Sequence, residues 1–276
     1  MTATASVEDE TPFAAELAFT VEVAERAGRL LSQRYERVER IDYKSARDVV
    51  TEVDHLSESL ILGAIREAYP GDAILAEESG EHRGARRPED ALAHGRTWVV
   101  DPLDGTINYA NGIPFFCVSV ALTVDGRPTV AVVHDPSRGE TFSAVAGTRA
   151  RLDSDVIAAS DKDKLSDFVV SLALGGRSAA SRSRALRKAI RVPRSMGSAA
   201  LALAYVGNGR FDAFVQQGGL SVWDVAAAGL IAECGGAQVT DMDGAGWFDV
   251  ARKTRTIGLL AAPAAHHGAI LALARG

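Results

Sequence analysis

Hydrophobic residues recur with two periods along the chain, and each period predicts a different kind of element. Apolar residues three or four apart predict a helix over residues 11–38, with Thr11 as its N-cap, and a second over residues 54–69, which Pro70-Gly71 ends. Two runs of β-branched residues flank Asp125-Gly126, which is typical of a hairpin turn. In this half we expect a loop over residues 78–96 and strands over residues 41–43, 73–76, 97–100, 115–124, 128–134 and 140–145.

The second half of the chain alternates between the two periods. Helical spacing recurs over residues 180–190, 198–206, 222–234 and 264–274, and strand-like runs occur at residues 168–172, 211–215 and 257–261. An antiparallel first half joined to an alternating second half predicts an α/β fold with layered helices and sheets. No repeat or linker rich in proline and serine divides the chain. We therefore expect one unit of two subdomains, residues 11–150 and 151–276, after a tail of residues 1–10.

Composition and charge narrow the classes of function. The chain has 276 residues, 47% hydrophobic and 24% charged, as in an ordinary globular protein. It has no apolar run of ~18 residues and no signal-peptide pattern, so we expect a cytoplasmic protein that does not cross a membrane. The net charge of −6 argues against non-specific nucleic-acid binding, and an anionic substrate would need bound cations at its site. We expect Cys117 and Cys234 to be buried free thiols.

The most informative segment is WVVDPLDGT, residues 98–106. An apolar strand ends at Asp101, Pro102 forces a turn, and Asp104 precedes what could be a helix. Free backbone N–H groups at a helix start favour an anion, whereas two adjacent carboxylates favour a divalent cation. A metal-bound phosphate would satisfy both, although Asp-Pro and Asp-Gly pairs are also ordinary turn sequences.

Three more carboxylates lie at the ends of predicted elements. Asp54 begins a helix, Glu77 follows a short strand, and Asp224 lies in the first turn of an apolar helix. Each has a simple structural explanation, as a helix cap, a solvated loop residue or a partner of the helix dipole. Taken together, they are carboxylates at the ends of buried elements, where the residues of an α/β site converge.

These segments also match a family. In chain order, DVVTEVD (48–54), EES (77–79), DPLDGT (101–106) and WDVAAAG (223–229) resemble the motifs of the inositol monophosphatase-like family of metal-dependent sugar phosphatases, which includes fructose-1,6-bisphosphatase. The resemblance covers residues 13–236 and continues through INYANGIPFFCVSVAL (107–122). It implies the sugar-phosphatase fold, an αβαβα sandwich. It also implies a homodimer, inhibition by lithium, and two or three Mg²⁺ per subunit that Mn²⁺ can replace.

The resemblance assigns roles by position. It implies that Asp101 bridges two ions, that Asp54, Glu77 and the Thr106 hydroxyl orient the attacking water, and that Lys44 and Asp54 lie near a weakly held third metal. The implied metal ligands are Glu77, Asp101, Asp104, Asp224 and the carbonyl of Leu103. The residues implied to bind the phosphate or the alcohol portion of the substrate are Asp104, Gly105, Thr106, Gly197, Ser198, Ala199, Gln216 and Asp224.

The chemistry has a physical basis that is independent of the resemblance. A phosphate monoester is a dianion that repels a hydroxide nucleophile, and metal ions cancel this repulsion and lower the pKa of bound water. Oxygen ligands alone suit Mg²⁺ or Mn²⁺ and not zinc. None of the six histidines has metal-ligand spacing beside the carboxylates, so we interpret them as non-ligands.

Two departures from the family pattern concern specificity. Inositol-selective members carry a glutamate ahead of the WD motif, where this chain has Gln216 and one extra residue before Asp224. Glutamine still bonds a hydroxyl but lacks the strength of a charged acceptor. Residues 147–157 lack the usual Asn-Gly or Asp-Gly turn, which we expect to alter only a surface hairpin.

The substrate therefore stays open at this stage. Six arginines between residues 177 and 194 form either a solvated helix face or a site for a second phosphate or a partner. Inositol 1-phosphate is the leading substrate, and the rivals are fructose 1,6-bisphosphate, histidinol phosphate and 3′-phosphoadenosine 5′-phosphate. A regulatory scaffold that binds RNA-associated machinery or other proteins is the non-enzymatic alternative, and degraded metal ligands, which this chain does not have, would favour it.

Overall fold

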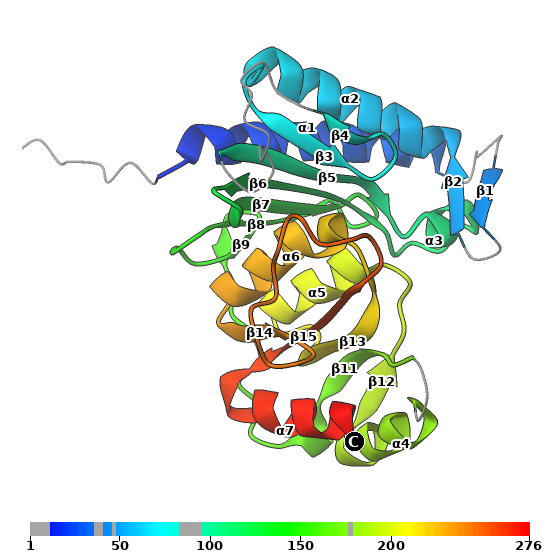
Figure 1. Ribbon diagram of the computed structural model, residues 1–276, viewed down its shortest axis with the longest axis vertical. Coiled ribbons are helices and arrows are strands. Elements are labelled where there is room, and N and C mark those ends of the chain that lie inside the picture. Colours follow the sequence, from blue (N-terminus) through cyan, green and yellow to red (C-terminus); the bar gives the residue numbers. More distant parts are fainter. Residues whose placement is uncertain (1–11, 36–40, 46–47, 83–94, 176–178) are drawn as a thin grey trace, which may run out of the picture.

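The computed structural model describes residues 12–35, 41–45, 48–82, 95–175 and 179–276, with only the backbone described for 41–45, 48–50 and 179. Its helices and strands form five layers (Figure 1). The helices are α1 (Ala14–Arg34), α2 (Glu52–Ala68), α3 (Thr106–Ala110), α4 (Ala179–Ala189), α5 (Ala199–Gly207), α6 (Val222–Cys234) and α7 (Ala264–Arg275), with a short 3-10 turn at Leu165–Asp167.

The first sheet has eight strands in the order β10-β9-β8-β7-β6-β5-β3-β4. All neighbouring strands are antiparallel except β3 and β5, which run parallel. Its strands are β3 (Ala73–Ala76), β4 (Gly80–His82), β5 (Arg96–Asp104), β6 (Cys117–Val124), β7 (Arg127–Asp135), β8 (Glu140–Val145), β9 (Arg151–Leu152) and β10 (Asp155–Val156).

The second sheet has five strands in the order β12-β11-β13-β15-β14. Strand β11 runs parallel to both its neighbours, and β15 runs antiparallel to both of its own. The strands are β11 (Val169–Ala173), β12 (Val192–Arg194), β13 (Ala213–Leu220), β14 (Ala237–Asp241) and β15 (Ile257–Pro263). A separate two-stranded ribbon joins β1 (Ile41–Ser45) to β2 (Asp48–Thr51).

Hydrophobic burial explains the order of the layers. Helices α1 and α2 cover one face of the first sheet, α5 and α6 lie between the two sheets, and α4 and α7 cover the outer face of the second sheet (Figure 1). Helices α5 and α6 are apolar nearly all round because sheets flank them on both sides. The predicted layered α/β fold, an αβαβα sandwich, is therefore confirmed.

Several predicted boundaries were wrong. The first helix begins at Ala14 and ends at Arg34, and Thr11, its expected cap, lies outside the described residues. The loop expected over residues 78–96 contains strand β4 at Gly80–His82, and the edge strands β12 and β14 were not predicted. The subdomain boundary at residue 150 stays a prediction, as does the tail of residues 1–10.

Both cysteines are free, as predicted, although only Cys117 is fully buried and Cys234 is partly exposed. Among the described residues, no helix combines the length and the apolar character needed to cross a membrane.

Candidate metal centre

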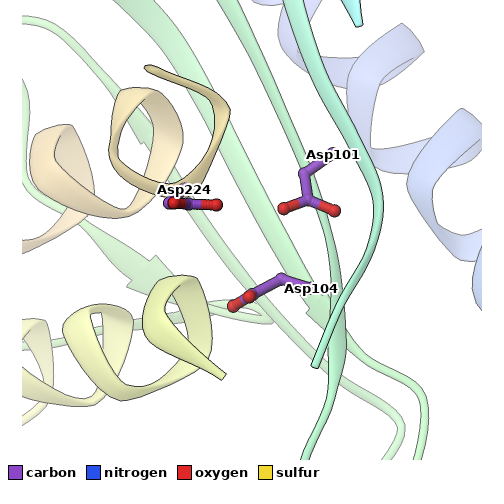
Figure 2. Close-up of side chains that lie close together, drawn as sticks. All are labelled: Asp101, Asp104 and Asp224. Carbon is purple, nitrogen blue, oxygen red and sulfur yellow. The ribbon is translucent and has the colours of Figure 1, made fainter. Parts of the chain in front are cut away.

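Three aspartates from two layers of the fold meet at one point. Asp101 and Asp104 lie at the end of β5, and Asp224 lies in the first turn of α6. Each offers a carboxylate oxygen to a group in which these oxygens all lie within 4.8 Å of one another. Figure 2 shows the three side chains converging on a common space. The structure thus brings together three of the four predicted carboxylate ligands in one cluster.

A bulge in β5 makes this convergence possible. Asp101 pairs with Ser119 of β6 and Asp104 pairs with Cys117, so three steps along β5 oppose two along β6. Side chains three residues apart on a regular strand point to opposite faces, and one extra residue restores them to the same side. The backbone N–H of Leu103 donates to Oδ1 of Asp101 (3.1 Å), which fixes the carboxylate within the bulge.

Helix starts hold the other two aspartates. Oδ2 of Asp104 accepts hydrogen bonds from the Ser198 hydroxyl and the Ala200 backbone N–H, both at 2.6 Å, at the start of α5. Oδ2 of Asp224 accepts from the backbone N–H of Ser221 (2.7 Å), and the Ser221 hydroxyl completes a capping box in return. Each aspartate is therefore oriented by the protein through one of its oxygens.

The cluster is electrostatically incomplete without a cation. Burial raises the pKa of Asp101 well above its usual range, and the neighbouring carboxylates of Glu77, Asp104 and Asp224 raise it further. Burial and the carboxylates of Asp104 and Glu77 also raise the pKa of Asp224, which Arg255 lowers only in part. The described residues that line the surrounding cavity of 140 Å³ include no arginine or lysine. A pocket of crowded oxygen donors fits a hard divalent cation such as Mg²⁺ or Mn²⁺.

Glu77 reaches the same cavity from the end of β3. Its backbone N–H donates to the carbonyl of Val100 on β5 (3.1 Å), so the turn after β3 follows β5 to the cluster. The buried carboxylate of Glu58 on α2 accepts from the backbone N–H of Glu78 (2.9 Å) and anchors that turn. Glu58 was not singled out from the sequence, because a buried helical glutamate has no local signature.

Asp54 and Thr106 form a hydrogen-bonded pair beside the cluster. The Thr106 hydroxyl lies 2.9 Å from Oδ1 of Asp54 and 3.0 Å from the carbonyl oxygen of Leu103. Oδ2 of Asp54 accepts from both the backbone N–H and the hydroxyl of Thr51. The simpler interpretation of Asp54 as the N-cap was therefore wrong, because Thr51 is the N-cap of α2 and Asp54 is its partner three residues later in the capping box. Burial raises the pKa of Asp54 to about 6.

Two glycines allow the loops to approach closely here. Gly105 has φ +98° and Gly197 has φ +86°, values that L side chains rarely adopt. A Cβ at Gly105 would lie 3.0 Å from the carbonyl oxygen of Phe115, and one at Gly197 would lie 2.8 Å from the Asn108 side chain. The amide of Asn108 in turn donates to the carbonyls of Phe115 and Met196, both at 2.7 Å.

Asn108, like Ser221, was not proposed from the sequence. Its position in the INYANG segment offered no chemical signal, because its role depends on two loops that are distant in the chain. Ser221 did leave a signal, since serine three residues before Asp224 fits the capping-box pattern.

A second cavity of 260 Å³ adjoins the cluster, with Asp104, Gly197 and Asp224 lining both. Its remaining walls include the predicted residues Ser198, Ala199 and Gln216. The amide nitrogen of Gln216 donates to the carbonyl of Gly218 (3.2 Å). The Lys44 side chain lies outside the described part of the structure, so its predicted place near a third metal stays a prediction.

Two larger cavities lie elsewhere. One of 880 Å³ lies at the far end of α6, beside Trp247 and Cys234, and one of 730 Å³ lies between α1 and β8. Neither is lined by any of the predicted site residues. Cavity size alone would therefore have indicated a different site from the carboxylate cluster.

Comparison with known proteins agrees with this geometry. A curated relative, the Nus factor SuhB of Pasteurella multocida, is 37% identical over 238 residues, which are 83% of this chain and 85% of that protein. The extragenic suppressor protein SuhB of Bartonella henselae has a solved structure with TM-score 0.86 and 31% identity, covering 95% of this chain and 99% of that one. An IMPase of Thermotoga maritima gives 0.84 and 30%, covering 95% and 97%.

The family itself is identified by a match over nearly the whole chain. The model of the inositol monophosphatase family matches residues 14–276, from the start of α1 to the last residue. The fold, the order of the motifs and the aspartate cluster all agree with this match. The chain therefore belongs to the inositol monophosphatase family.

Proposed function

We propose that this chain is a Mg²⁺-dependent phosphatase that hydrolyses small phosphate monoesters, with inositol 1-phosphate as its first substrate. The observation that carries the proposal is the cluster of Asp101, Asp104 and Asp224, whose oxygens crowd within 4.8 Å of one another. Bound Mg²⁺ would lower the pKa of water and neutralise charge on the phosphate and the leaving group. Glu77 and the carbonyl of Leu103 complete the proposed ligand set.

The residues beside the cluster support a role in positioning the water. The carboxylate of Asp54 accepts a hydrogen bond from the Thr106 hydroxyl, which leaves the lone pairs of that hydroxyl free to accept a hydrogen bond from the attacking water. Asp54, with a pKa of about 6, is mostly ionised at neutral pH and keeps this orientation. Glu77 lines the same cavity and is the second residue proposed to orient the water.

The adjoining cavity supports a polar alcohol portion. Ser171, Ser195 and Gln216 offer neutral hydrogen-bonding groups along walls that also hold Asp104 and Asp224. Gly105 and Thr106 are proposed to offer backbone N–H groups to the phosphate, and Gly197 to Ala199 to line the ring pocket. Because Gln216 is neutral, fructose 1,6-bisphosphate, histidinol phosphate and 3′-phosphoadenosine 5′-phosphate remain rival substrates.

Phosphate release tests the proposal. We expect turnover of inositol 1-phosphate that needs Mg²⁺ and stops with EDTA, and that lithium inhibits. Asp101→Asn should reduce kcat far more than tenfold, whereas the same change at the exposed Asp243 should leave it unchanged. If Asp101→Asn retains more than about a tenth of kcat, which is roughly 1.4 kcal/mol of barrier, Asp101 does not bridge two ions.

A second candidate function comes from the relatives. Several proteins that are 36 to 38% identical to this chain are named Nus factor SuhB, so we also propose a binding role in transcription as the alternative. The complete carboxylate set favours the phosphatase. Absence of release from inositol 1-phosphate and all the rival substrates would favour the binding role. We further propose a cytoplasmic homodimer with two subdomains, residues 11–150 and 151–276.

A further inference from the structure

One arginine of α4 reaches across to the second sheet. Nη2 of Arg182 donates to the side-chain carbonyl of Gln217 on β13 (2.6 Å) and to the backbone carbonyl of Gly175, which follows β11 (2.8 Å). Its aliphatic stem lies beside the last residue, since a Cβ at Gly276 would be 3.2 Å from Cγ of Arg182. Arg182 therefore links three segments that are distant in the chain.

The contact at Gln217 falls on an irregular part of β13. Gln216 pairs with Leu259 of β15 and Leu220 pairs with Ile257, so four steps along β13 oppose two along β15. We call residues 217–219, which these extra steps create, the β13 bulge. Gly219 has φ +87°. The bulge also lies tightly on β15, because a Cβ at Gly258 would approach the Gln217 carbonyl oxygen to 2.4 Å.

The β13 bulge forms part of the cavity that adjoins the metal cluster. Gln216, Gly219 and Leu220 line the 260 Å³ cavity together with Asp104 and Asp224. Leu220 is followed directly by Ser221, whose backbone N–H bonds the carboxylate of Asp224. A shift of the bulge would therefore move the cavity wall first and the cap of α6 next.

The partners of Arg182 indicate a geometric role. Both of its acceptors are neutral carbonyl oxygens, and among the described residues no carboxylate forms an ion pair with it. Its Nε is buried and has no hydrogen-bond partner in the described part of the chain. With two neutral acceptors, the guanidinium links the backbone carbonyl of Gly175 to the side chain of Gln217 and so holds these two segments at a fixed separation.

We propose that Arg182 is a positioning residue that, through Gln217, fixes the β13 bulge and so sets the affinity of the site for the alcohol portion of its substrate. This inference rests on the proposed phosphatase function for its kinetic consequence but not for its structural one. Arg182 lines neither the metal cavity nor the adjoining one, so it takes no part in hydrolysis.

Variants of both partners test the link. Arg182→Met keeps the stem that packs on Gly276 and removes the donors, and Gln217→Leu removes the acceptor with little change in size. Arg182→Lys retains a cationic donor group, so its KM for inositol 1-phosphate should lie between the values of the wild type and of Arg182→Met. Arg187→Met is the matched control, because Nε of Arg187 bonds the Ser183 hydroxyl within the same helix and makes no other hydrogen bond to the described residues.

The kinetic measurement compares two substrates of different size. For inositol 1-phosphate, Arg182→Met and Gln217→Leu should each raise KM about tenfold with kcat within about twofold, and the double variant should be no worse than either. For ethyl phosphate, whose two-carbon alcohol portion carries no hydroxyl group, KM should not change. An equal rise in KM for both substrates, additive effects of the two variants, or the same rise in Arg187→Met would overturn the proposal.

Hydrogen exchange tests the structural part without any turnover. Backbone amides of residues 217–219 should exchange about tenfold faster in Arg182→Met than in the wild type or in Arg187→Met. Unchanged exchange would refute the positioning role. If the wild type hydrolyses neither ester while exchange responds as expected, the proposed phosphatase function fails and the link between Arg182 and the bulge stands.

Discussion

Replacing Asp101 by asparagine should stabilise the metal-free protein, although it removes a buried carboxylate. Asp101 is 1% exposed, and its oxygen lies within 4.8 Å of an oxygen of Asp104 and of Asp224. At that distance and an effective dielectric constant of ~20, two ionised carboxylates repel each other by about 3.5 kcal/mol. Proton uptake relieves part of this repulsion, because burial and the neighbouring carboxylates raise the pKa of Asp101. We therefore expect a net gain of about 2 kcal/mol.

The asparagine is a close replacement in shape. Its carbonyl oxygen can accept the hydrogen bond that the Leu103 N–H now donates to Oδ1 of Asp101 at 3.1 Å. The loss on substitution is thus confined to charge. A gain of about 2 kcal/mol corresponds to a rise of roughly 4 to 8 °C in Tm for a chain of this size.

Thermal unfolding in EDTA and in Mg²⁺ at constant ionic strength measures both consequences. In EDTA the variant should melt above the wild type. In Mg²⁺ the wild type should gain stability through ion binding, and the variant should gain little. The control is Asp135→Asn, a fully buried aspartate whose carboxylate is paired with Arg138 at 2.9 Å and accepts from the Ser137 N–H at 2.9 Å, so its loss should lower Tm.

The sign of the pH dependence gives a further check. A carboxyl group whose pKa is raised on folding binds more protons in the folded state, so the metal-free wild type should become less stable as pH rises. The advantage of Asp101→Asn in EDTA should therefore grow between pH 6 and pH 8.5. A variant that melts below the wild type in EDTA, or that keeps the full Mg²⁺ response, would refute the account of the cluster as repelling charges awaiting a cation.

Three other substitutions test the surrounding structure. His134→Gln should weaken the loss of stability on acidification, measured by urea unfolding between pH 7.5 and 5.5. Burial lowers the pKa of His134, so the unfolded chain binds this proton at a higher pH than the folded chain does, and the free energy of unfolding decreases as the pH is lowered. The control is His55→Gln at an exposed position, which should leave this pH dependence unchanged. Gly105→Ala should cost about 1 to 3 kcal/mol in urea unfolding and lower kcat, because φ is +98° and Phe115 crowds the new Cβ. Asp212→Asn should cost about 2 to 3 kcal/mol in the same assay with kcat unchanged, since its carboxylate accepts from the Val169 N–H at 2.6 Å and pairs with Lys162 at 2.8 Å.

The sequence predicted the layers well because burial has a periodic signature. Helices α5 and α6 and the hairpin of β6 and β7 have long apolar runs, and each was predicted close to its observed bounds. The short edge strands β12 and β14 were missed because their existence depends on a neighbouring strand and not on their own pattern. Ends of helices depend on contacts in the same way, which is why α1 stops at Arg34, four residues before the predicted end.

The candidate site was predictable only as a set of side chains. Motif order indicated which carboxylates belong together, but the bulge that turns Asp101 and Asp104 to one side depends on pairing with β6. Similarly, the irregular pairing that creates the β13 bulge depends on the register with β15, which no local pattern of β13 indicates. Supporting groups such as Glu58 and Asn108 bond loops that are distant in the chain, so no local pattern announces them.

Because the carboxylates of the cluster repel one another, hydrophobic burial must hold the surrounding helices in place more strongly than it would around a cluster of neutral residues. Helix α6 carries Asp224 at its start and buries Val225, Leu230 and Ile231, each with at most 4% of its surface exposed. Burial of three such side chains contributes roughly 5 to 9 kcal/mol. This is of the same order as the repulsion within the cluster, which is about 10 kcal/mol when all three carboxylate pairs are ionised and less when proton uptake relieves part of it. Because α6 packs between both sheets, the same burial that offsets the repulsion also holds Asp224 beside β5 before any cation binds. A site arranged in advance spends little of the binding free energy on ordering its ligands, so a cation that favours oxygen ligands can bind it tightly.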